Sequence, residues 1–476
     1  MAVENKVMLI TYADSMGGDL KILEQLLKAY FQKALGSIHI LPFYPSSADR
    51  GFAPMTYREV DPSFGTWQDV ERISKNFGLM YDFMINHISR SSEYFQDFVA
   101  HKDASRYRDL FIRWESFWDE GRPYPSDIDA IYKRKPRHPF TEVAFADGSS
   151  GKVWCTFDNE QIDLDLTSTV GKTFVFENLK YLSQRGASVI RLDAFAYAIK
   201  KQGTSCFFLE PEIYTLLEEI QDHLTPYGVL VLPEIHEHYT MQLKLSQKGF
   251  WVYDFALPML MLYSIYEGKA GRLFNWLKIC PRKQFTTLDT HDGIGIVDVM
   301  GLLSEREIEQ TKQNIFNRGV NVKPAYNTMS YNNLDIYQIN STFYSALGNR
   351  DDAYLLSRAV QFFAPGIPQV YYVGLLAGEN DIDLLEATKI GRNINRHSYK
   401  QYEVDEALKR PVVQKLIALM EFRNTCPAFN GAFRVEQQDA STLLLTWTNG
   451  EHLAQLIANF QDISYQISYT GGGQLT

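Results

Sequence analysis

The sequence predicts a (β/α)8 barrel with two inserted subdomains and a small β domain after the barrel. Three observations support this fold class. Strand-like and helix-like segments alternate over most of the 476 residues. Three of the strand-like segments end in a carboxylate, which is where barrel enzymes keep their chemistry. The last part of the chain changes to short alternating runs, which are typical of antiparallel strands. A chain of this length has room for all of these parts.

Eight short apolar or β-branched segments predict the barrel strands: residues 7–12, 38–43, 79–85, 188–193, 229–234, 250–255, 285–292 and 367–372. Segments with helical spacing of apolar residues predict the helices: residues 20–35, 67–77, 170–184, 212–223, 258–277, 351–363 and 412–424. Regular alternation of strands and helices favours a closed parallel barrel over an open sheet.

The alternation is interrupted twice. A stretch rich in aromatic, charged and turn residues predicts an inserted subdomain at residues 88–167, and a second irregular stretch predicts another at 294–347. The barrel is then expected to comprise residues 1–87, 168–293 and 348–428. Two alternating runs, at 442–448 and 454–459, predict a C-terminal β domain at 429–476.

Composition excludes several classes of protein. Hydrophobic residues make up 45% and charged residues 22%, as in an ordinary globular protein, and the net charge of −10 argues against nucleic-acid binding. No stretch approaches a membrane span or resembles a signal peptide. The four cysteines are far apart and suggest neither a zinc site nor a disulfide framework, so a reduced cytoplasm is the expected location.

Three carboxylates at predicted strand ends form the candidate active site: Asp193, Glu234 and Asp292. Arg191 precedes Asp193 by two residues and shares its face of the strand, so we expect the arginine to lower the pKa of Asp193 and keep it ionised, as a nucleophile requires. Glu234 ends an apolar strand, and burial would raise its pKa toward that of a general acid. Two structural interpretations remain open for these residues taken alone: Arg191 and Asp193 as an ion pair, and Glu234 as a helix cap.

Two other groups have simple explanations. The run His236–Glu237–His238 lacks the spacing of a metal-binding motif, so no metal is expected. The basic cluster at residues 133–137 is, by itself, a solvated loop.

Taken together, residues 82–87 and 191–193, Glu234, and residues 291–292 resemble the four signature regions of the α-amylase family of retaining α-glucoside enzymes. More specific motifs are similar to those of the sucrose phosphorylases within that family: residues 13–15, 49–54, 191–197, 288–295, 333–338 and 391–397. The similarity covers nearly the whole chain, and only the tail after about Cys426 departs from it.

The resemblance implies a role for each acid. Asp193 would be the nucleophile, Glu234 the general acid and base, and Asp292 the group that stabilises the transition state. The resemblance also implies a substrate site made of Asp49, Phe52, His87, Phe157, Gln161, Arg191, Tyr197, His291 and Arg392. Asp335, Tyr337 and Gln338 would form the acceptor loop. Arg134 would bind phosphate together with Tyr337, and Lys135 is the alternative to Arg134.

The expected reaction is the reversible transfer of a glucosyl group from sucrose to phosphate, giving α-D-glucose 1-phosphate and D-fructose through a covalent β-glucosyl-enzyme. It requires neither a cofactor nor a metal. Three alternatives remain: a sister phosphorylase acting on sucrose 6′-phosphate, glucosylglycerol or glucosylglycerate; a hydrolase or isomerase of α-glucosides; and a non-catalytic amylase-like subunit. The absence of an extra cation beside Tyr337 favours unphosphorylated sucrose. Whether the enzyme is a monomer or a homodimer is left open.

Overall fold

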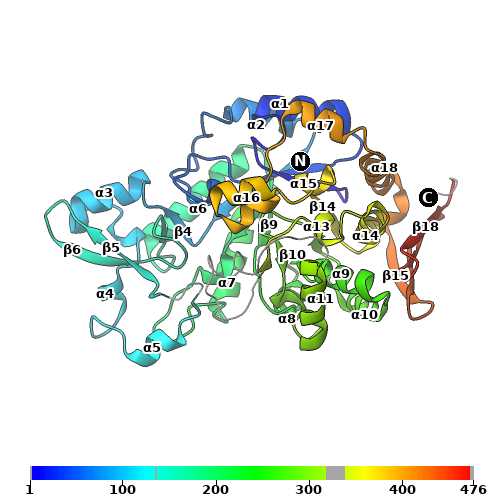
Figure 1. Cartoon of the computed structure of the whole chain (residues 1–476). Coiled ribbons are helices and arrows are strands. Elements are labelled where there is room, and N and C mark those ends of the chain that lie inside the picture. The colour runs from blue at the N-terminus through cyan, green and yellow to red at the C-terminus, as the bar shows by residue number, and fades with distance from the viewer. Residues whose placement is uncertain (1–2, 134–136, 318–337, 472–476) are drawn as a thin grey trace. The chain divides into compact units, whose positions relative to one another are not determined.

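The computed structural model describes residues 3–133, 137–317 and 338–471 (Figure 1). They form two compact units, one made mainly by Ile40–Ile235 and the other by Glu4–His39 with the chain that follows Ile235. Four residues predicted for the acceptor and phosphate sites fall outside the described residues: Arg134, Lys135, Asp335 and Tyr337.

Each of the eight segments predicted as a barrel strand overlaps an observed strand. They are β1 (Met8–Thr11), β2 (Ser37–Ile40), β3 (Gly78–Met84), β8 (Ala187–Asp193), β9 (Leu230–Pro233), β10 (Val252–Asp254), β11 (Gln284–Thr286) and β14 (Ile367–Tyr371). Two of the predicted strands end several residues early, and the one predicted over 38–43 ends at Ile40. The segment predicted as a strand over 285–292 ends at Thr286, so Asp289 and Asp292 lie in the loop beyond β11 rather than on the strand.

In the first unit, β3 pairs in parallel with β8, and β8 pairs in parallel with β9. The register sets Asp82 opposite Arg191, and Leu192 opposite Pro233. All seven residues of β3 are buried, including Asp82. This register brings the charged residues of the three strands to one end of the sheet.

In the second unit, the strand order is β10, β11, β14, β1. All three pairings are parallel: Tyr253 lies opposite Phe285, Phe285 opposite Ile367, and Ile10 opposite Tyr371. The four strands consist of buried residues, as expected for parallel strands covered on both faces.

Helices follow the strands along the chain. They are α1 (Leu20–Leu26), α2 (Trp67–Ser74), α6 (Thr169–Gln184), α7 (Glu212–Leu224), α8 (Thr240–Gln247), α9 (Leu257–Glu267), α10 (Gly271–Ile279), α14 (Asp351–Phe363), α15 (Tyr372–Leu375), α16 (Ile382–Thr388), α17 (Gln401–Ala407) and α18 (Pro411–Thr425). The single helix predicted over 258–277 is instead two helices. Gly268 adopts a left-handed conformation with φ of 64°, which ends α9.

The first predicted insertion contains α3 (Glu93–His101), α4 (Trp114–Phe117), α5 (Pro125–Ala130), β5 (Phe140–Ala144), β6 (Ser150–Trp154) and β7 (Gln161–Asp163). β5 and β6 form an antiparallel pair, and β7 pairs with β4 (His87–Ser89). Its aromatic residues pack on one another: the ring centroid of Trp114 lies 5.3 Å from that of Trp118 and 5.1 Å from that of Trp154. The aromatic richness of this stretch therefore builds a small core.

The second predicted insertion is more regular than expected. It contains β12 (Ile294–Gly295), α11 (Glu305–Asn317), β13 (Gln338–Ile339) and, near its end, α13 (Phe343–Ala346). The α11 helix was not predicted. Its Glu307 carboxylate binds both the Arg272 guanidinium, at 2.9 and 3.0 Å, and the Tyr263 hydroxyl, at 2.8 Å. These contacts with α9 and α10 stabilise a segment whose own sequence is mostly polar.

The C-terminal strands, orange to red in Figure 1, form a four-stranded antiparallel sheet: β15 (Ala432–Gln437), β16 (Thr442–Asn449), β17 (His452–Asn459) and β18 (Ser464–Tyr469). Only β16 and β17 were predicted. Trp447 of β16 is buried, and its indole N–H donates to the carbonyl of Phe363 in α14 at 2.7 Å. In the described part of the chain, no helix is both long and apolar enough to cross a bilayer. The predicted domain boundaries remain predictions.

Candidate active site

Arg191 is the centre of a buried charge cluster in the first unit. Its Nη1 lies 2.6 Å from Asp82 Oδ1 and 2.9 Å from Asp193 Oδ1, and its Nη2 lies 3.6 Å from Glu234 Oε1. The Arg191 side chain is 3% exposed. One guanidinium thus holds three carboxyl groups at the ends of three neighbouring strands. The sequence placed Arg191 beside Asp193, but only the strand register adds Asp82 and Glu234.

Glu234 is also bound by the backbone next to Asp193. The N–H of Ala194 donates to Glu234 Oε2 at 3.0 Å. Ala194 has φ of 54°, in the left-handed region that non-glycine residues rarely occupy. The left-handed conformation turns the chain sharply just after the β8 strand ends, and strain of this kind gathers at functional sites.

The pKa of Asp193 is raised and not lowered as expected from its neighbour Arg191. Burial, together with the charges of Glu234 and Asp82, raises the pKa of Asp193 to about 8, although the Arg191 charge lowers it. The arginine does act in the predicted direction, but desolvation outweighs it. Three carboxyl groups around one guanidinium carry excess negative charge, so the cluster retains a proton near neutral pH.

A wall of mostly buried residues lies in the same unit. The carbonyl oxygen of Phe52 is 2.9 Å from His87 Nε2 and accepts a hydrogen bond from Gln161 Nε2, also at 2.9 Å. Burial lowers the pKa of His87, which favours the neutral imidazole. The Phe157 ring packs edge-on against His87 and Tyr197, at centroid distances of 5.5 and 5.1 Å. Five residues predicted for the substrate site therefore lie in contact with one another.

Asp49 begins a strained turn. Asp49 and Arg50 have φ of 48° and 49°, and Gly51 has φ of 109°. A side chain at Gly51 would meet the carbonyl of Pro42, since a Cβ there would lie 2.5 Å from that oxygen. Three consecutive residues with positive φ fix a tight turn that leads into Phe52.

A buried ion pair holds the residue before His87. Lys200 Nζ lies 2.8 Å from Asp163 Oδ2, and it donates to Asn86 Oδ1 at 2.5 Å and to the Tyr197 carbonyl at 2.6 Å. Both charged side chains are almost fully buried, at 2% and 0% exposed. Asp163 also accepts from the amide and hydroxyl of Thr156. The network was not predicted, because its members are spread over 115 positions of sequence from Asn86 to Lys200.

Within the second unit, His291, Asp292 and Arg392 lie close together. Asp292 Oδ1 lies 3.0 Å from Arg392 Nη1, and its Oδ2 lies 3.4 Å from His291 Nε2. His291 and Asp292 are buried. These three predicted residues, from the loop after β11 and from η8 (Gly391–Asn395), thus form one group.

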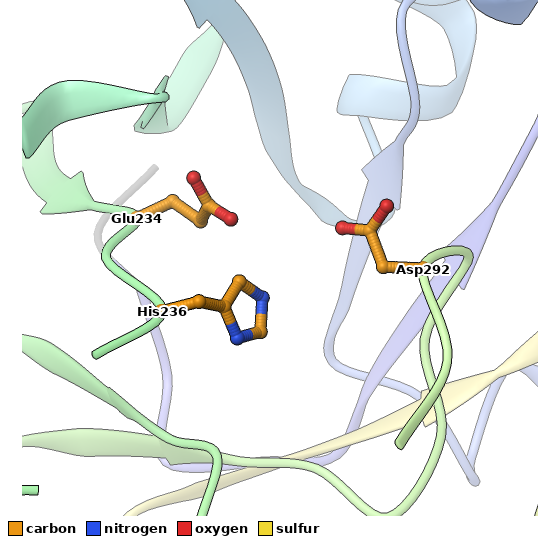
Figure 2. Close-up of side chains that lie close together, drawn as sticks. All are labelled: Glu234, His236 and Asp292. Carbon is orange, nitrogen blue, oxygen red and sulfur yellow. The ribbon is translucent and has the colours of Figure 1, made fainter. Parts of the chain in front are cut away.

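His236 is a further buried residue of the second unit that the sequence did not single out as a substrate contact. Its ring stacks on Phe255 with centroids 3.8 Å apart, and its Nδ1 lies 3.5 Å from Asp298 Oδ2. Figure 2 shows Glu234 and His236 on the chain that leaves β9, and Asp292 on the loop that follows β11. The only sequence signal for His236 was its position two residues after Glu234.

His236 and Asp292 offer possible metal ligand atoms within 4.8 Å of each other. The Arg392 guanidinium, however, already lies 3.0 Å from the Asp292 carboxylate and supplies the positive charge that a metal ion would bring. A divalent cation beside that guanidinium would be repelled. His236, Asp292 and Arg392 therefore suit a sugar-binding site without a metal ion better than a metal site.

Two described residues border the predicted acceptor and phosphate segments. Arg137 donates to Asn159 Oδ1 at 2.9 Å and to the Phe157 carbonyl at 3.1 Å, so its guanidinium supports the wall that contains Phe157. Gln338 lies in β13, opposite Gly295 of β12. The pairing fixes the backbone where the predicted acceptor segment ends.

Known proteins resemble this chain over most of its length. The family model described as "Alpha amylase, catalytic domain" matches residues 9–249. A protein of Streptococcus mutans named sucrose phosphorylase is 52% identical, with 98% of each chain covered. A protein of Thermoanaerobacterium thermosaccharolyticum named sucrose 6(F)-phosphate phosphorylase is 44% identical, again with 98% of each covered.

The solved structures agree with this grouping. A crystal structure of the sucrose 6F-phosphate phosphorylase from Thermoanaerobacter thermosaccharolyticum matches with a TM-score of 0.95 and 43% identity, covering 100% of this chain and 98% of the other. The predicted fold class is thereby confirmed as a (β/α)8 barrel with a C-terminal antiparallel β domain.

Proposed function

Because the chain belongs to the alpha-amylase family, we propose that it transfers the glucosyl group of sucrose to phosphate with retention, giving α-D-glucose 1-phosphate and D-fructose. The observation that carries the proposal is the Arg191 cluster, in which a nucleophile candidate and an acid candidate share one guanidinium. The 52% identity to a sucrose phosphorylase supports sucrose and phosphate as the substrates.

The first half-reaction uses both acids of the cluster. A carboxylate oxygen of Asp193 forms a bond to the anomeric carbon of the glucosyl group while the bond to the fructosyl oxygen breaks. That oxygen takes the departing electron pair and receives the proton from Glu234, so fructose leaves as a neutral molecule. The product on the enzyme is a β-glucosyl ester of Asp193.

The second half-reaction reverses these roles with a different acceptor. A phosphate oxygen attacks the anomeric carbon, the ester bond to Asp193 breaks, and Glu234 accepts the phosphate proton. Two inversions at the same carbon restore the α configuration. The acceptor must be an anion here, whereas it is water in a hydrolase.

The charge cluster suits the shared proton that this cycle needs. Asp193 must be ionised when it attacks and Glu234 must be protonated, so the pair requires one proton between them. The raised pKa of Asp193 supports a cluster that keeps such a proton near neutral pH. Arg191 contacts both carboxyl groups, at 2.9 Å for Asp193 and 3.6 Å for Glu234, so its charge can stabilise the ionised nucleophile while the proton stays within the pair.

Other predicted substrate-site residues supply the remaining groups of the proposed glucosyl site. Neutral His87 can donate to or accept from a sugar hydroxyl. Phe52 offers a ring toward the developing positive charge. In the second unit, Asp292 stabilises the oxocarbenium-like transition state, and His291 and Arg392 bind hydroxyl groups. Asp49, Phe157, Gln161 and Tyr197 complete the proposed glucosyl site.

Phosphate binding is assigned to Arg134 and Tyr337, with Lys135 as the alternative to Arg134, and the acceptor loop to Asp335, Tyr337 and Gln338. Support comes from the neighbouring Arg137, which is held by Asn159 and Phe157. A guanidinium bound in this way is poorly placed to bind phosphate, and the family resemblance favours residues 134 and 135 over the other basic residues of the cluster. A cytoplasmic location and a monomeric or homodimeric state also remain predictions.

A phosphate-dependence assay tests the proposal. The protein is incubated with sucrose, with and without phosphate, and glucose 1-phosphate and free glucose are measured. We expect glucose 1-phosphate in the α configuration, and little free glucose when phosphate is present. Free glucose formed equally with and without phosphate would identify a hydrolase and overturn the proposal.

A sister activity is the second candidate, because a sucrose 6(F)-phosphate phosphorylase is 44% identical to this chain. The same assay with sucrose 6′-phosphate and with glucosylglycerol as donors decides between them. We expect the highest kcat/KM with sucrose. A higher value with either of the other donors would reassign the acceptor specificity while leaving the chemistry unchanged.

A further inference from the structure

The loop that carries Asp292 has no strand partner of its own. β11 ends at Thr286, and residues 287–292 continue without regular secondary structure, although Asp289, His291 and Asp292 are buried. Buried backbone and carboxylate oxygens require hydrogen-bond donors from elsewhere. The position of this loop is therefore set by the side chains that supply those donors.

Four consecutive loop residues each have such a partner. The Asp289 carboxylate is bound by Arg358 Nη2 at 2.7 and 2.8 Å. Asn395 Nδ2 donates to the Thr290 carbonyl at 3.0 Å. Arg396 Nε donates to the His291 carbonyl at 3.0 Å. Arg392 Nη1 lies 3.0 Å from Asp292 Oδ1.

Three of these four partners come from one short segment. Arg392 and Asn395 lie in the 3-10 helix η8 (Gly391–Asn395), and Arg396 is its C-cap. A 3-10 helix has three residues per turn, so residues 392 and 395 project from the same side. The segment can thus bind the carboxylate of Asp292 and the backbone before it at the same time.

Asn395 and Arg396 are themselves buried, each residue 2% exposed. The Asn395 Oδ1 atom has no hydrogen-bond partner among the described residues, so the amide is kept in place although one end of it is unsatisfied. A buried amide that satisfies only its donor is costly, and a leucine of similar size would avoid that cost. The hydrogen bond from Asn395 Nδ2 to the Thr290 carbonyl is the interaction that a leucine would lose.

We propose that Asn395 and Arg396 are positioning residues for the reaction: they hold the backbone of Thr290 and His291 and thereby set where the His291 ring and the Asp292 carboxylate stand. The inference rests on the proposed role of Asp292 in stabilising the transition state. Preorganised charge loses its effect on the rate when it shifts, while the ground-state complex is less sensitive. The two residues therefore act on kcat without contacting the substrate.

The test compares Asn395→Leu and Arg396→Lys with the control Asn393→Leu. Asn393 lies in the same 3-10 helix, but its side chain donates to Thr388 and not to the loop. Lysine keeps the positive charge of Arg396 but lacks the Nε donor. We expect kcat for sucrose phosphorolysis to fall about tenfold to a hundredfold in the two test variants, as for a displacement of the order of 1 Å. KM and the melting temperature should change little, and the control should keep its activity.

A double variant separates positioning from general loss of structure. In an Asp292→Asn background, Asn395→Leu should cause little further loss of kcat, because the group that it positions is already disabled. A full additional loss in that background, or equal kcat in Asn395→Leu and Asn393→Leu, would overturn the inference. If Asp292→Asn itself kept normal activity, the proposed role of Asp292 would fail instead, so the two failures are distinguishable.

Discussion

The amide of Ala194 donates a hydrogen bond to the Glu234 carboxylate at 3.0 Å, which links the residue after the proposed nucleophile to the proposed acid. Ala194 adopts a left-handed conformation at the end of β8. Strain of this kind costs of the order of 1–3 kcal/mol. The hydrogen bond and the Arg191 contacts help to hold the two acids in place.

The two acids should fail in different ways. Asp193→Asn should lower phosphorolysis of sucrose by several orders of magnitude, and so should Glu234→Gln. With α-glucosyl fluoride, whose leaving group needs no proton, Glu234→Gln should recover much of the first half-reaction and Asp193→Asn should not. Fluoride release measures this step. Equal rescue of both variants would reverse or remove the assigned roles.

The pH profile should have an alkaline limb that belongs to the acid cluster. Because the pKa of Asp193 is raised to about 8, the shared proton is present below that pH and leaves above it. Without that proton, Glu234 cannot protonate fructose, so kcat/KM for sucrose should fall above about pH 8. The limb should be absent with α-glucosyl fluoride as donor. A profile that stays flat to pH 10 with sucrose would contradict the shared proton.

Lys200 should be required for stability, unlike the next residue along the chain. Lys200→Met leaves the Asp163 carboxylate buried without its cation, which typically costs about 3–5 kcal/mol in the free energy of unfolding. The matched control is Lys201→Met, because Lys201 is 61% exposed and pairs with Glu212 at the surface. That change should cost less than about 1 kcal/mol.

Denaturant unfolding measures both lysine variants. Because Lys200 also binds Asn86, the residue before His87, Lys200→Met should raise KM for sucrose in the molecules that remain folded. Equal stabilities of the two variants would show that the buried pair makes no net contribution.

The phosphate site can be assigned by two neighbouring substitutions. Arg134→Gln should raise KM for phosphate without a comparable change in KM for sucrose, because it removes a charge-assisted contact to the anion. Lys135→Gln should have a much smaller effect. Initial rates over a range of phosphate concentrations give both constants. The opposite result would transfer the role to Lys135, and no effect of either would place the phosphate elsewhere.

Short-range patterns in the sequence were sufficient for most of the fold. Each barrel strand was predicted because a parallel strand buried on both faces is a continuous apolar run, which is visible without tertiary information. The two errors in the helices have different causes, one local and one distant. Gly268 divides the predicted helix 258–277, and α11 depends on the contacts of Glu307 with Arg272 and Tyr263. A helix stabilised mainly by such distant partners leaves little trace in its own sequence.

The sequence by itself determined the fold class, the family resemblance and the identity of the three acids, because these depend on residue types in a fixed order along the chain. Tertiary structure decided how the charges are distributed: Asp82 joins Arg191 through strand register, and burial raises the pKa of Asp193 against the effect of its arginine. It also decided that Asn395 and Arg396 hold the Asp292 loop. Desolvation and contacts across a hundred residues are properties of the packed chain, and no spacing in the sequence records them.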